Sequence, residues 1–103
     1  MVKEGDLLAV FNSAHRVMKV ESVLKELGLP ILLIPAPRLL KTDCGLAIRF
    51  RGDESERIMK ILEQEQLLPE FVSGYYQGEY KTLWQTSDPV ASLHYKGTFH
   101  ENN

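Results

Sequence analysis

The sequence is almost without cysteine: Cys44 is the only one in 103 residues. One cysteine cannot form an intramolecular disulfide, so the class of small disulfide scaffolds is excluded and a reducing compartment is the simpler expectation. A chain of this length buries roughly two-thirds of its unfolded surface, enough for one domain with a modest core. The fold must therefore rest on packing.

Long apolar runs are also missing. The run at residues 31–34 is ended by Pro35 and Pro37, whereas a bilayer-spanning helix needs roughly 20 apolar residues. Residues 1–12 contain a short apolar run with acidic residues before it and no small-residue cleavage site, unlike a signal peptide. We expect a soluble, cytoplasmic protein with no membrane partner.

The charge pattern gives little support for nucleic acid or metal as a partner. Net charge is −2, and the basic residues are spread along the chain rather than gathered in a run. Cys44, His15, His94 and His100 lack the short paired spacings of structural zinc sites. A glycine-rich phosphate loop and a Gly-x-Ser-x-Gly motif are absent from the sequence. We expect no nucleic-acid partner, no metal and no cofactor.

The first third of the chain reads as strand, helix, strand. Residues 7–11 (LLAVF) form a continuous apolar run, as in a buried strand. Asn12 and Ser13 follow as candidate N-caps. Residues 14–27 repeat apolar side chains at helical spacing, and Gly28 supplies a stop. Residues 31–34 then predict a second strand, and residues 35–43 a loop with a short helical turn.

The second half repeats this order. Residues 45–50 alternate apolar and other residues, which predicts a half-buried third strand. Asp53 and Glu56 resemble a capping box at the start of a second helix, which should run to about Leu68. Residues 71–77 favour a fourth strand.

The order of these elements predicts an α+β fold, the ferredoxin-like split β-α-β sandwich (βαββαβ), with two helices on one face of a four-stranded antiparallel sheet. We assign residues 1–77 to this domain. Residues 78–103 hold no sustained period and read as an extension, in which Tyr80, Leu83 and Trp84 dock on the domain or on a second copy and residues 100–103 are loose.

This topology brings Cys44 to the start of the first helix. Strand three runs antiparallel between strands one and two, so it begins at the edge where strand one ends. Cys44 should therefore lie beside Asn12, Ser13 and His15. The partial positive charge of a helix N-terminus favours a thiolate, and Arg38 adds to that field.

Two neighbours of Cys44 act in opposite ways. Gly45 has no side chain, so a second molecule can approach the thiol closely. Asn12, Ser13 and Gly45 are therefore the residues that we expect to bind a ligand. Asp43 disfavours the thiolate by its negative charge. Free cysteine is also among the most buried residue types, so an inert core thiol is the competing interpretation.

The sequence resembles a family of small bacterial proteins of unknown function described as selenium/sulfur carrier-like. The resemblance covers roughly residues 5–77. It rests on a Ser-x-His helix start and a Pro-x-Pro-Arg loop leading to Cys-Gly, present here as Ser13, His15, Glu21, Pro35, Pro37, Arg38, Cys44 and Gly45.

The resemblance implies that Cys44 accepts sulfur or selenium as a persulfide or selenosulfide and passes it on, with His15 and Arg38 in support. Donor and acceptor proteins are then the partners, and the protein is a carrier rather than a stand-alone enzyme. Two alternatives stay open: a ferredoxin-like binding, regulatory or dimerisation module with a structural cysteine, and a thiol redox sensor.

Overall fold

The computed structural model describes residues 2–86. In chain order the elements are β1 (Asp6–Val10), α1 (Ala14–Glu26), β2 (Leu32–Pro35), the 3-10 turn η1 (Arg38–Leu40), β3 (Leu46–Arg51), the 3-10 turn η2 (Gly52–Glu54), α2 (Ser55–Gln64), β4 (Phe71–Tyr76) and β5 (Glu79–Gln85).

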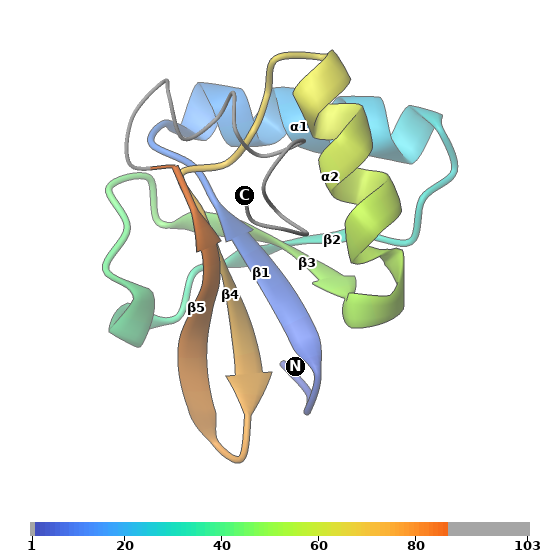
Figure 1. Ribbon diagram of the computed structural model, residues 1–103. Helices are drawn as coiled ribbons and strands as arrows, with labels where there is room; N and C mark the ends of the chain where they lie inside the picture. The colour runs from blue at the N-terminus through green and yellow to red at the C-terminus, as the bar shows by residue number, and fades with distance from the viewer. Residues whose placement is uncertain (1, 87–103) are drawn as a thin grey trace.

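The five strands form one antiparallel sheet in the order β2-β3-β1-β4-β5, with α1 and α2 on the same side of it (Figure 1). The predicted α+β class, the two helices and the antiparallel sheet are confirmed. The first four strands have the expected order, with β3 between β1 and β2. The predicted number of strands was wrong, because β5 adds a fifth at the β4 edge.

The fifth strand begins at a two-residue turn. Gln77 and Gly78 have φ of 53° and 78°, the left-handed conformation that a tight hairpin turn requires at both positions. β5 then pairs with β4 along its length, with an irregularity between Val72 and Ser73. Trp84 packs against the apolar core between the sheet and the helices, and Tyr80 packs on the other face of the sheet. Because the pairing is irregular at this point and most of β5 is exposed at the edge of the sheet, apolar and polar residues do not alternate along β5. The sequence pattern therefore does not reveal this strand.

The first helix agrees with its prediction. The hydroxyl oxygen of Ser13 accepts a hydrogen bond from the Arg16 amide at 3.2 Å and caps α1. Val17, Val20 and Leu24 are fully buried, and each such burial contributes roughly 1.5–3 kcal/mol.

The second helix begins later and ends earlier than predicted. The Asp53 carboxylate accepts from the Arg51 guanidinium at 2.8 Å, and no side chain caps α2. A 3-10 turn therefore occupies the place of the expected capping box. At the other end Gln66 has φ of 59°, so the helix stops before Leu67, which turns inward and is buried.

Two apolar clusters lie on opposite faces of the sheet. The larger one, between the sheet and both helices, contains Leu7, Ala9, Phe11, Ile48, Phe50 and Val72 from the sheet side and Val17, Val20, Leu24, Ile58, Met59 and Leu62 from the helices. On the other face, called here the helix-free face, Leu8, Val10, Ile34 and Ala47 are covered by partly buried residues that include Leu40, Phe71 and Tyr80. The loop before β3 therefore helps to close the second core.

Candidate functional site

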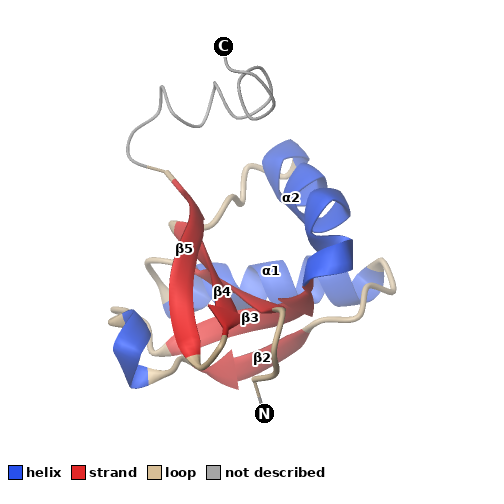
Figure 2. Ribbon diagram, turned by 60° about the horizontal axis from the view of Figure 1, so that its bottom comes forward, coloured by secondary structure: helices blue, strands red, loops and turns tan. Residues whose placement is uncertain are grey.

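The loop at residues 36–45 joins β2 to β3 and is closed on itself. The Ala36 amide donates to the Gly45 carbonyl oxygen at 2.9 Å, so the two ends of the loop lie together, as in a compact Ω-loop. The Gly45 amide donates to the hydroxyl oxygen of Thr42 at 2.8 Å. η1 occupies the middle of this loop and projects from the sheet on the side away from α2 (Figure 2).

Cys44 lies in this loop and is half-buried. Its Sγ is 3.3 Å from the carbonyl oxygens of both Phe11 and Leu46, and the Leu46 amide donates to it at 3.4 Å. The side chain also packs against the core beneath the helices. The loop thus holds the thiol between the end of β1 and the start of β3.

The expected meeting of Cys44 with the end of β1 is present, but the partner of the thiol differs from the expected one. Sγ contacts the Phe11 carbonyl, and within residues 2–86 the amide that donates to it is that of Leu46 rather than one from α1. Asn12 and His15 are exposed. The hydroxyl oxygen of Ser13 already accepts from the Arg16 amide, so Ser13 is first a helix cap.

Gly45 has φ of 73°, and a Cβ added there would meet no atom within 4 Å. The positive φ explains why glycine suits this position. The open space beside the residue is compatible with close approach of a second molecule to the loop.

Arg38 and Arg16 have different surroundings. Arg38 is exposed at the start of η1. Arg16, whose charge meets the positive end of the α1 dipole, donates to the carbonyl oxygen of Gln66 at 3.1 Å. A carbonyl from the turn after α2 therefore provides the compensation for this unfavourable position.

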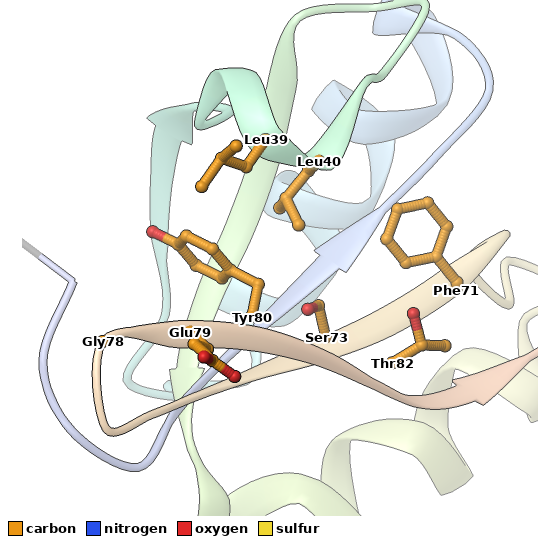
Figure 3. Close-up of a pocket in the computed structure, with 8 residues that line it drawn as sticks. All are labelled: Leu39, Leu40, Phe71, Ser73, Gly78, Glu79, Tyr80 and Thr82. Atoms are coloured by element: carbon orange, nitrogen blue, oxygen red, sulfur yellow. The ribbon is translucent and has the colours of Figure 1, made fainter.

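A groove of about 400 Å³ lies on the helix-free face between η1 and the β4–β5 hairpin. Figure 3 shows Leu39 and Leu40 of η1 facing Tyr80, Ser73 and Thr82 across it. The remaining lining residues are Phe71, Gly78 and Glu79. One wall of the groove thus belongs to the loop that carries Cys44.

Sequence reasoning missed Thr42, the Phe11 carbonyl and the groove. A threonine three residues before a glycine is a sequence signal for a local side-chain-to-backbone turn, so Thr42 could have been found. The other two depend on pairing between distant segments.

Within residues 2–86, no group of three or more His, Cys, Asp or Glu side chains could hold a metal ion. The helices of this same range are too short or too polar to cross a membrane.

The family model described as "Putative Se/S carrier protein-like" matches residues 6–73. The carbamoyl phosphate synthase large chains of Methanosarcina mazei and Methanosarcina acetivorans are each 28% identical over 96 residues. These matches include 85% of this chain but 8% of either relative. No solved structure matches the chain.

Proposed function

The chain belongs to the Se/S carrier protein-like family, and from this membership we propose that Cys44 accepts a sulfane sulfur or selenium atom and passes it to a partner protein. The observation that carries the proposal is the position of the thiol. Cys44 is the only cysteine, and its closed loop holds it half-buried beside a glycine whose Cα has open space around it. The matching large chains are far longer than this one, and we propose no activity from them.

The transfer is an exchange without net oxidation. The Cys44 sulfur attacks the terminal sulfur of a donor persulfide, a new S–S bond forms on Cys44, and the S–S bond of the donor breaks. The donor sulfur leaves with that electron pair and takes up the proton that Cys44 loses. An acceptor thiol removes the terminal sulfur by the same exchange and restores the Cys44 thiol. A donor that carries terminal selenium gives Cys44–S–SeH with the same balance.

We assign supporting roles to residues from the start of α1 and from the loop that carries Cys44. His15, an exposed imidazole in the first turn of α1, carries the proton from Cys44 to the leaving donor sulfur. The exposed Arg38 guanidinium attracts the negatively charged persulfide. Asn12 and the backbone at Gly45 contact the incoming group, and Ser13 positions the helix start through its cap.

The test is intact mass after incubation with a cysteine desulfurase and cysteine, and separately with inorganic polysulfide. The wild-type chain gains the mass of one sulfur atom and loses it on reduction. Cys44→Ser, which keeps a small hydrogen-bonding side chain, gains nothing. A wild-type chain without an adduct, or an adduct that persists in Cys44→Ser, contradicts the proposal.

The main alternative is a ferredoxin-like binding, regulatory or dimerisation module with a structural cysteine. One observation favours it: the thiol is half-buried, packs against the core and donates to backbone carbonyls. A Cys44 that alkylates only after unfolding would select this alternative. The carrier proposal places the protein in the bacterial cytoplasm, where a thiol stays reduced.

A further inference from the structure

Resting on the proposed function, we propose that the free thiol of Cys44 anchors the loop at residues 36–45, and that loading of Cys44 removes the anchor and opens the loop. The loop is then a switch that regulates the carrier site: it is closed in the empty chain and opens in the loaded one. The contacts of Sγ, the hydrogen bonds of the loop and the backbone of η1 support this assignment.

The contacts of Sγ suit a free thiol. Sγ lies 3.3 Å from the carbonyl oxygens of Phe11 and Leu46, and a thiol has one hydrogen that it can donate to such acceptors. Once Sγ is bound to a second sulfur it has lost that hydrogen, and its lone pairs face both oxygens. Of its contacts, the one from the Leu46 amide at 3.4 Å still suits the modified sulfur. A half-buried acceptor that loses its donor costs free energy, so loading favours withdrawal of Sγ.

The thiol ties the loop to a distant strand. Phe11 directly follows β1 and is 33 positions from Cys44. The hydrogen bonds of the loop's own amides, in contrast, join residues of the loop to one another: Ala36 to Gly45, Leu40 to Pro37, Lys41 to Arg38 and Gly45 to Thr42. Such local bonds shape the loop but do not attach it to β1. Loss of the Sγ contact therefore weakens the attachment of the whole loop.

The closed loop also has an unfavourable backbone. Lys41, which ends η1, has φ of 50° and ψ of 73°, in the left-handed region that disfavours residues with a Cβ. Opening of the loop relieves this residue. The apolar contact of Leu40 with the cluster on the helix-free face opposes opening, as does the thiol anchor. Removal of the anchor therefore shifts the balance toward the open loop.

Opening changes the surface that a partner protein meets. Leu39 and Leu40 of η1 form one wall of the groove beside β5 (Figure 3). A loop that opens moves this wall and uncovers part of the apolar cluster beneath Leu40. The loaded and the empty chain therefore differ on the helix-free face as well as at Cys44, and this difference lets a partner distinguish them.

The experiment measures trypsin cleavage of the full chain after Arg38 and Lys41, both exposed in the loop. Methyl methanethiosulfonate converts the thiol to Cys44–S–S–CH3. The S–S bond of the reagent breaks, and methanesulfinate leaves with its electron pair and takes up the thiol proton. This adduct places a second sulfur on Sγ without any donor protein. Cleavage after both residues should become about tenfold faster, because trypsin cuts the opened loop, and should slow again on reduction with dithiothreitol.

Two variants test the anchor without any adduct. Cys44→Ser keeps a donor at this position and should be cleaved at about the wild-type rate, with or without the reagent. Cys44→Ala removes the donor and should be cleaved faster than the untreated wild type. Cleavage after Lys60, an exposed residue of α2, should be the same in all these proteins. A Cys44→Ala chain cleaved as slowly as the wild type overturns the anchor.

The remaining outcomes separate this proposal from the proposed function. Equal cleavage of the free and the methylthiolated chain overturns the switch and leaves the carrier function standing. An equal increase after Lys60 also overturns the switch, because it shows general unfolding. A native thiol that does not react with the reagent contradicts both proposals. A chain that opens on methylthiolation but gains no sulfur from desulfurase or polysulfide supports the switch and contradicts the carrier function.

Discussion

The Sγ atom of Cys44 lies 3.3 Å from the carbonyl oxygen of Phe11, although 33 positions separate the two residues. This contact joins the loop before β3 to the end of β1. It also explains how a cysteine in a loop comes to pack against the core beneath the helices. The alkylation rate of the Cys44 thiol therefore reports how firmly the loop is held.

Removal of the Thr42 hydroxyl should loosen this loop. Thr42→Ala leaves the Gly45 amide without the acceptor it has at 2.8 Å, so local opening becomes easier while the sheet is unaffected. We expect faster alkylation of Cys44 in the native protein, with a loss in unfolding free energy of about 1 kcal/mol or less. Thr42→Ser keeps the acceptor and should alkylate at the wild-type rate. Equal rates in all three proteins would mean that this hydrogen bond does not control access.

Arg16 connects the start of α1 to the turn after α2. Arg16→Ala removes the hydrogen bond from its guanidinium to the Gln66 carbonyl but also removes a cation from a helix N-terminus, which offsets part of the loss. We expect urea denaturation to show about 0.5–1 kcal/mol lower stability. Lys19→Ala, an exposed change on the same helix, should be close to neutral. A loss as large in Lys19→Ala would assign the effect to the helix in general.

Gly74 has no room for a side chain. An added Cβ would overlap the ring of Tyr76 and lie 2.9 Å from Cδ1 of Leu83. Gly74→Ala should therefore destabilise the β4–β5 hairpin by about 1–3 kcal/mol, the usual cost of overpacking. Gly52→Ala is the matched control, since its Cβ would meet only the Gly5 carbonyl oxygen at 3.5 Å. Equal stabilities of the two variants would show that the Tyr76 ring moves aside at little cost.

Tyr80 should make stability depend on alkaline pH. Burial, and secondly the nearby Tyr75 charge, raise the pKa of the Tyr80 phenol above 10.0. Because the folded chain then keeps this proton longer than the unfolded chain, the contribution is complete below pH 10 and is lost as pH rises through the raised pKa. Urea denaturation between pH 9 and about 11 should show this decline.

Tyr80→Phe removes the titrating group and should decline less over the same range. The ring contact with Tyr75, whose centroids are 4.9 Å apart, is kept in that variant, so packing is largely matched. An unchanged decline in Tyr80→Phe would assign the pH dependence to other groups.

Elements with local signals were predicted correctly. The α1 helix has its cap at Ser13, its buried stripe within three turns and its stop at Gly28, all within one stretch of sequence. The start of α2 was wrong because Asp53 has a second local partner, Arg51, which takes its carboxylate. Two local interactions competed there, and the sequence pattern did not show which was stronger.

The fifth strand shows that local sequence signals do not identify every element. β5 has a turn signal at Gly78, but its apolar residues face different clusters, Tyr80 on the helix-free face and Trp84 on the helix side. Only pairing with β4 shows that they belong to one strand. Residues 87–103, which include His94 and His100, lie outside the described residues.

By itself the sequence determined the α+β class, the order of the first four strands and the approach of Cys44 to the end of β1. Those features follow from apolar periodicity, caps and the handedness of chain crossovers, which act over short stretches or by general rule. Only the tertiary structure decided that the thiol contacts the Phe11 carbonyl and that η1 forms a groove with β5. These depend on side chains and backbone atoms from distant segments, whose contacts exist only once the sheet has formed.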